Sequence, residues 1–139
     1  MAKQSETFQS VGYDPFAVNI TAANTTDWVT LYTVPASDAT IKGIGVTTTD
    51  TTTVNLRVAI DIGGTVYPCG CINIPVGAGT NGVARTVDLL NSIDLPQLPV
   101  DRNGKRVLPL KEGNIIKIAA LATMTANKVL TALGFSEKF

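Results

Sequence analysis

The sequence holds few of the side chains that usually carry catalysis, and it contains no histidine. Without His, neither a Ser-His-Asp triad nor a Cys-His pair can form, and the commonest zinc ligand is missing. The 11 acidic residues fall mostly in predicted turns, where a carboxylate caps local backbone N–H groups rather than facing a second acid across a substrate. We therefore expect a protein that is not an enzyme.

The two cysteines, Cys69 and Cys71, stand two positions apart. On a strand both would project from the same face, separated by about 7 Å along the chain. That separation suits a disulfide between them poorly, so we interpret both as free thiols in a reducing compartment. A metal site would need further ligands nearby, and we expect no metal and no cofactor.

Basic residues gather in one predicted turn, at Arg102, Lys105 and Arg106. The cluster is either a solvated loop or a contact to an acidic patch on a partner protein. The glycine-rich loop at residues 77–82 lacks the Gly-Lys-Ser/Thr ending of a phosphate loop, which leaves adaptable contact with a partner as its candidate role.

Length and composition bound the class of protein. The chain has 139 residues with 11 basic and 11 acidic side chains, and 45% of its residues are hydrophobic, which suits one domain with its own core. Zero net charge argues against sequence-independent nucleic-acid binding. No apolar run is long enough for a membrane span or a signal peptide. From the net charge and the hydropathy together, we expect neither nucleic acid nor a membrane as a partner. A Thr-rich surface of low charge favours packing against other proteins.

Strand signals dominate the chain. They are clearest at residues 54–62, where Val, Leu and Ile recur at every second position, and the following Gly63-Gly64 favours a hairpin turn. The expected strands are residues 17–20, 28–34, 40–46, 54–62, 65–74, 107–110, 115–121 and 128–135. Turns at short intervals, without alternating helices, predict an all-β fold: an antiparallel β-sandwich or a jelly-roll-like barrel of about eight strands.

One short helix is expected at residues 83–93. The apolar residues of that segment lie near helical spacing, and they are Val83, Val87, Leu90 and Ile93. A helix this short would depend on packing against the sheet.

Residues 1–16 predict an extended N-terminal arm in front of a single domain at residues 17–139. The segment is polar, contains Gly and Pro, and lacks sustained periodicity. Three aromatic residues, Phe8, Tyr13 and Phe16, favour an arm that docks on another surface over one that simply frays. Trp28 is the single tryptophan. Because it falls on an apolar strand, we expect its side chain to belong to the core and not to form a platform for a ligand.

Three segments resemble small bacteriophage virion proteins of the β-sandwich type. The sequence LYTVPA at 31–36, followed by ATIKGI at 39–44, is similar to an opening common in these proteins. A second segment runs from VDLLN at 87–91 through LPQLPVDRNG at 95–104, and VLPLKEGN at 107–114 is similar to a segment before their last strands. The order and spacing of the segments carry the resemblance, which covers about residues 28–121.

The resemblance implies a capsid decoration (cement) protein. Such a protein would bind the major capsid protein, bridge neighbouring capsid subunits and stabilise the phage head, with a homotrimer favoured. It would be made in the host cytoplasm and reside in the virion. Phe8, Tyr13 and Phe16 would dock the arm, while Arg102, Lys105 and Arg106 would pair with capsid acids. The alternative is a head-fibre or tail-associated module that binds a host glycan or receptor through Trp28 or Tyr67.

Overall fold

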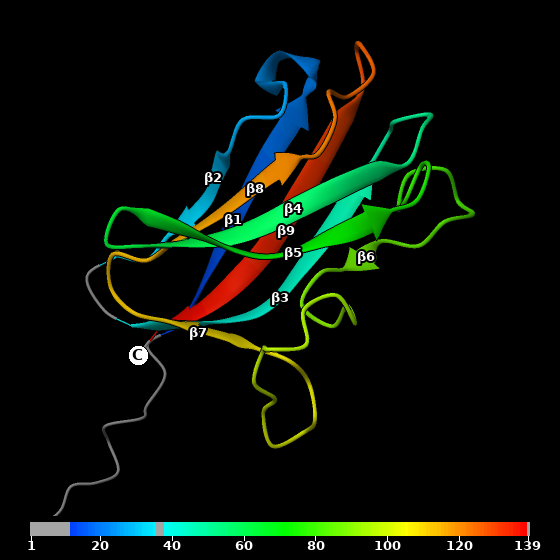
Figure 1. Ribbon diagram of the computed structural model, residues 1–139. Coiled ribbons are helices and arrows are strands. Elements are labelled where there is room, and N and C mark those ends of the chain that lie inside the picture. Colours follow the sequence, from blue (N-terminus) through cyan, green and yellow to red (C-terminus); the bar gives the residue numbers. More distant parts are fainter. Residues whose placement is uncertain (1–11, 36–37, 139) are drawn as a thin grey trace, which may run out of the picture.

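The computed structural model describes residues 12–35 and 38–138, and it is a β-sandwich of two antiparallel sheets (Figure 1). Apart from one 3₁₀ turn, η2 (Ala22–Asn24), the regular elements of these residues are all strands. They are β1 (Gly12–Thr21), β2 (Val29–Thr33), β3 (Ala39–Thr48), β4 (Val54–Ile62), β5 (Thr65–Ile74), β6 (Val87–Asp88), β7 (Leu108–Leu110), β8 (Ile115–Ala120) and β9 (Val129–Lys138).

The strand order is that of a jelly roll. One sheet has the order β1-β9-β3-β6, with the short β7 also paired to β3, and the other has the order β2-β8-β4-β5. The chain therefore passes repeatedly from one sheet to the other, and the first and last strands end up side by side. This is the double-sheet arrangement of two Greek keys. The prediction of an all-β antiparallel sandwich is confirmed.

Alternation along the strands builds the core. In β4 the residues Val54, Leu56 and Val58 are buried against the other sheet, as the period of two in the sequence requires. β3 contributes Ile41, Ile44 and others to the same interior. The core lies between the two sheets.

The aromatic residue Phe16 belongs to this core. Its side chain is 8% exposed, and its ring stacks on Tyr32 with ring centroids 4.7 Å apart. Opposite Phe16 in the sheet stands Gly134, where an added Cβ would lie 2.6 Å from the Phe16 ring and 2.6 Å from the Gly43 carbonyl oxygen. The ring thus occupies the space that a side chain at position 134 would need. The Ser136 hydroxyl donates a hydrogen bond of 2.9 Å to the Tyr32 hydroxyl and fixes the far side of the stack.

The predicted start of the domain at residue 17 is wrong, because β1 begins at Gly12. Residues 12–16 pair with β9 in continuous antiparallel register, from Gly12 opposite Lys138 to Phe16 opposite Gly134. Pro15 interrupts the sequence signal but is tolerated here, because β1 is an edge strand and one side of it needs no partner. Residues 1–11 lie outside the described residues.

The predicted helix at residues 83–93 is also wrong. This segment contains the two-residue strand β6, paired to β3, and otherwise turns and bends. Two of the four residues that suggested helical spacing, Val83 and Ile93, are 87% exposed, whereas the consecutive pair Leu89 and Leu90 is buried. A consecutive buried pair fits a loop pressed onto the sandwich edge and not one face of a helix.

No helix in the described part of the chain is both long enough and apolar enough to cross a membrane.

Candidate interaction surface

The outer face of the β1-β9-β3 sheet carries exposed apolar side chains. Phe135 and Leu133 on β9 point away from the core and are 49% and 47% exposed, and Tyr13 on β1 is 59% exposed. Phe135 stands between Pro15 and Gly43 in the sheet, and Leu133 stands between Ala17 and Gly45. We call these seven residues the apolar face.

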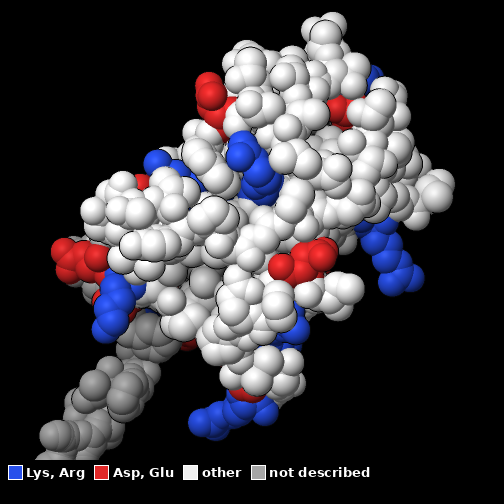
Figure 2. Space-filling view, viewed as in Figure 1, with Lys and Arg blue, Asp and Glu red and all other residues white. Residues whose placement is uncertain are grey.

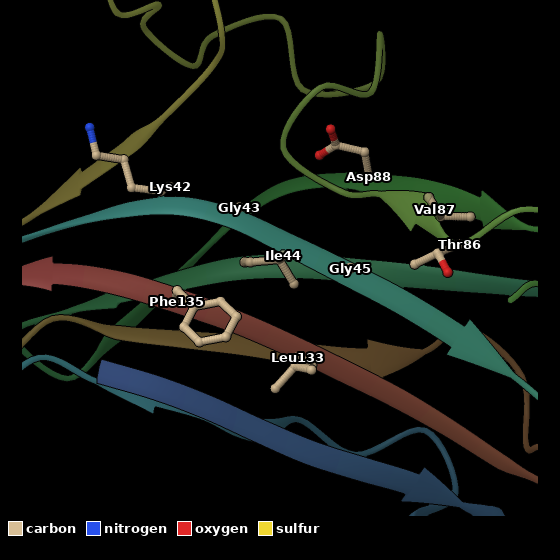
Figure 3. A pocket seen from close by; sticks show the side chains of 9 residues that line it. All are labelled: Lys42, Gly43, Ile44, Gly45, Thr86, Val87, Asp88, Leu133 and Phe135. Carbon is tan, nitrogen blue, oxygen red and sulfur yellow. The ribbon is translucent and has the colours of Figure 1, made fainter. Parts of the chain in front are cut away.

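A shallow hollow of about 420 Å³ lies on the β3 side of the apolar face (Figure 3). Phe135 and Leu133 form one side of it, while Thr86, Val87 and Asp88 form the other. Gly43 and Gly45 leave the floor between them as bare backbone, because neither has a side chain to fill the space. At Gly43 an added Cβ would meet nothing within 4 Å, so this part of the floor is open.

Two ion pairs lie beside the apolar face. The Lys42 ammonium lies 3.3 Å from the Glu137 carboxylate, and the Lys138 ammonium lies 3.1 Å from the Asp14 carboxylate. Asp88 at the hollow accepts a hydrogen bond of 2.8 Å from the Asn91 side chain. These contacts leave a surface that suits an apolar, uncharged occupant better than a charged one. Figure 2 shows the molecule as oriented in Figure 1, with charged side chains scattered between uncharged ones.

The three aromatic residues expected to dock the arm have different positions. Tyr13 lies on the apolar face, where it is available to a partner. Phe16 is a core residue, so its predicted role in docking is wrong. Phe8 lies outside the described residues.

The basic turn places two of its three cations in solvent. Arg102 and Lys105 are exposed, on a turn that Asp101 organises by accepting hydrogen bonds from the backbone N–H groups of Asn103 (2.9 Å) and Lys105 (3.0 Å). Arg106 instead turns back and donates to two backbone carbonyl oxygens, of Ser92 at 2.6 Å and of Leu95 at 2.9 Å. Arg106 therefore holds the 91–106 segment together, and only Arg102 and Lys105 are free to reach a partner.

The glycine-rich loop is held by internal hydrogen bonds. Ala78 is buried and accepts from the Thr48 N–H at 2.9 Å, and the Thr80 hydroxyl donates to the Thr48 carbonyl at 2.7 Å. The Asn81 side chain accepts from the N–H groups of Val83 and Ala84 at 2.8 Å and 2.9 Å. The loop is thus anchored to the end of β3, and the exposed apolar residues Val76 and Val83 flank it.

Asp50, a buried carboxylate, has a structural setting. It is 1% exposed and lies in the β3–β4 connection. Thr125 donates to it through its hydroxyl at 2.7 Å and its backbone N–H at 3.1 Å, and Thr52 donates through its N–H at 2.9 Å and its hydroxyl at 3.0 Å. Burial alone raises the pKa of Asp50, but these hydrogen bonds outweigh burial and lower it from 3.8 to about 2. The four bonds tie the β3–β4 and β8–β9 loops together.

The thiols and the tryptophan offer little to a ligand. Cys69 and Cys71 are free thiols. Burial raises the pKa of Cys69, which lowers the fraction of this thiol that is present as the reactive thiolate. Trp28 is half-buried, and the Arg57 guanidinium lies over its ring at 4.6 Å from the centroid. Tyr67, on the β4–β5 sheet, remains an exposed aromatic residue. Among the described residues no group of three or more Cys, Asp or Glu side chains could hold a metal ion.

One feature of the sequence indicates the apolar face: the last strand, β9, carries apolar residues on both of its faces. In β9 the inward residues Leu130 and Ala132 alternate with Val129, Leu133 and Phe135, which point outward, so the strand is apolar on both faces. Such a strand is typical of a sheet covered on both sides. Within residues 12–35 and 38–138, only the inner side of β9 is covered.

Comparison with known proteins adds no family assignment. No protein-family model and no curated protein matches the chain. Among solved structures, the cyanophage Pam1 capsid asymmetric unit is similar at 12% identity and a TM-score of 0.47, over 100% of this chain and 93% of that one. The nucleoplasmin-like N-terminal domain of Drosophila FKBP39 is similar at 10% identity and a TM-score of 0.43, over 95% of this chain and 96% of that one. Both similarities are remote.

Proposed function

We propose that this chain is a structural protein of a bacteriophage particle and, more specifically, a capsid decoration protein that bridges neighbouring subunits of the major capsid protein. The observation that carries the proposal is the apolar face on the outside of a jelly-roll sheet. A contiguous exposed apolar surface marks a protein-binding site, and jelly rolls are a recurrent architecture of viral capsid domains. The three segments that resemble phage virion proteins support the same class.

The proposed mechanism is physical. Each bound copy adds buried surface between capsid subunits, and repetition over the shell multiplies a modest gain per copy. Arg102 and Lys105 would pair with capsid carboxylates at the rim, where ion pairs guide orientation and association rate more than affinity. A homotrimer at the three-fold positions of the shell would match the symmetry of the capsid.

Binding to particles tests this proposal. Purified chain is mixed with particles that lack it, the particles are pelleted, and the bound chain is quantified. We expect the full chain to pellet with particles, and a variant without residues 1–11 to bind at least about tenfold more weakly, because the arm contributes an aromatic anchor. The Thr30→Gln variant, changed at an exposed site on the opposite sheet, serves as the matched control and should bind as the full chain does. A full chain that stays in the supernatant contradicts the proposal.

A further inference from the structure

Strand β5 is an edge of the β2-β8-β4-β5 sheet, so one side of its backbone faces away from the other strands of that sheet. Such an edge offers unpaired N–H and C=O groups, and proteins commonly cover it with a loop or guard it with charged side chains. β5 (Thr65–Ile74) contains no Asp, Glu, Lys or Arg. A cover from elsewhere in the chain is therefore the protection to look for.

The segment at residues 91–98, which we call the strap, lies against the middle of this edge. The side-chain amide of Gln97 donates a hydrogen bond of 3.0 Å to the backbone carbonyl oxygen of Cys69. Cys69 is the extra residue of a β-bulge and stands opposite no residue of β4. Gln97 thus supplies to β5 a hydrogen bond of the kind that a neighbouring strand would give.

Gly70 allows the strap to come this close. A Cβ added at Gly70 would lie 2.5 Å from the backbone oxygen of Asp94 and 3.0 Å from Cδ2 of Leu95. Leu95 is 1% exposed and belongs to the core cluster, so an apolar side chain holds the strap here in addition to the hydrogen bond of Gln97. The glycine between the two cysteines is therefore required by the contact with the strap.

Arg106 fastens the strap from further along the chain. Its guanidinium donates hydrogen bonds to the carbonyl oxygens of Ser92 at 2.6 Å and of Leu95 at 2.9 Å. Its backbone N–H donates to the side-chain oxygen of Asn91 at 3.2 Å. Hydrogen bonds from a charged donor are stronger than those between neutral groups, so the guanidinium acts as a latch on the strap.

The two cysteines differ in their relation to the strap. Cys69 is half-buried and packs against the core cluster, as does Leu98 of the strap. Cys71 is exposed and stands opposite Arg57 on β4. A strap that lifts from the edge would therefore uncover Cys69 and leave Cys71 as accessible as before.

We propose that the strap opens and closes over the β5 edge as a unit, with Arg106 as its latch. Opening exposes the edge and the Cys69 thiol while the two sheets stay folded. A segment held by few contacts opens at a lower free energy than the whole domain unfolds, and the strap is held by the latch, by Gln97 and by the burial of Leu95. This opening belongs to the folded chain itself, whether or not the chain binds a particle.

The rate at which a maleimide labels Cys69 measures the opening. In the Cys71→Ser background Cys69 is the single thiol, because the chain has two cysteines. Arg106→Gln removes the latch, and Gly70→Ala pushes against the strap from the side of β5. We expect each variant to raise the labelling rate of Cys69 at least about tenfold, because each removes strong hydrogen bonds or close packing that only the closed strap has.

Two matched controls separate the strap contacts from the loss of a charge or of a glycine. Arg102→Gln removes an exposed guanidinium from the turn that follows the strap, and Gly43→Ala adds a Cβ to a strand glycine where nothing lies within 4 Å. Both should leave the labelling rate of Cys69 within about twofold of the parent, as for other exposed sites. If Arg106→Gln and Gly70→Ala label no faster than these controls, the inference is overturned.

Hydrogen exchange measured by mass spectrometry shows whether the opening is local. Peptides from the strap and from β8 (Ile115–Ala120), an interior strand of the same sheet, are followed in the parent, Arg106→Gln and Gly70→Ala. We expect faster exchange in the strap of both variants and unchanged exchange in β8. Exchange that rises by the same factor in β8 would mean that Cys69 is uncovered only when the whole domain opens, and this result overturns the inference.

Discussion

Replacing Phe16 by alanine is expected to lower the free energy of unfolding by about 3–5 kcal/mol, the usual cost of removing a buried aromatic side chain. The ring is almost fully buried, stacks on Tyr32 and fills the space above Gly134, so its removal leaves a cavity bounded by two strands and the opposite sheet. Urea unfolding monitored by Trp28 fluorescence measures the loss.

Tyr13→Ala is the matched control for that experiment. Tyr13 is an aromatic residue on the same strand, three positions away, but it lies on the exposed outer face. Its replacement should change stability by no more than about 0.5 kcal/mol, as for other exposed sites. Equal losses from the two variants would contradict the placement of Phe16 in the core and return it to the docking surface.

Neutralising Asp50 is expected to cost about 2 kcal/mol near neutral pH. The pKa of Asp50 is about 2 in the folded protein against an ordinary value of 3.8, and each unit of difference corresponds to about 1.4 kcal/mol. Because the folded pKa is the lower one, this stabilisation is present above about pH 4 and is lost as the pH falls from about 4 to about 2. The Asp50→Asn variant should lack this part of the acid dependence.

Urea unfolding at pH 7 and at pH 2.5 separates the two contributions. The difference in stability between wild type and Asp50→Asn should be about 2 kcal/mol at pH 7 and should shrink at pH 2.5. Asp27→Asn changes an exposed carboxylate and should leave the profile unaltered. An Asp50→Asn difference that is the same at both pH values would show that the four hydrogen bonds do not hold the carboxylate in its charged form.

The sequence predicts the sandwich well where one face of a strand is apolar and the other polar. In β4 the predicted and observed bounds coincide, because Val54, Leu56 and Val58 alternate with polar residues. The Gly63-Gly64 hairpin turn is also found where its dipeptide indicates, and both glycines have positive φ. Local patterns of this kind depend on neighbours along the chain, which a sequence displays directly.

The errors arise where long-range packing decides. Phe16 looks like part of an arm because Gly12 and Pro15 interrupt the pattern, yet β9, more than a hundred residues away, pairs with that segment. Residues 83–93 show helical spacing by chance, and the loop is instead fixed by contacts such as those of Arg106 with distant carbonyls. Three residues of the candidate surface, Tyr13, Arg102 and Lys105, are predicted from residue type. The glycine floor and its neighbours on β9 become visible only when the strand order is known.

The number of copies of this chain in purified particles tests the central claim most directly. Quantitative mass spectrometry of purified particles compares the amount of this chain with that of the major capsid protein. The account predicts on the order of hundreds of copies per particle, because a decoration protein repeats with the symmetry of the shell. A few to tens of copies would place the protein in a fibre or tail and contradict the decoration role, and absence from particles would contradict the virion assignment itself.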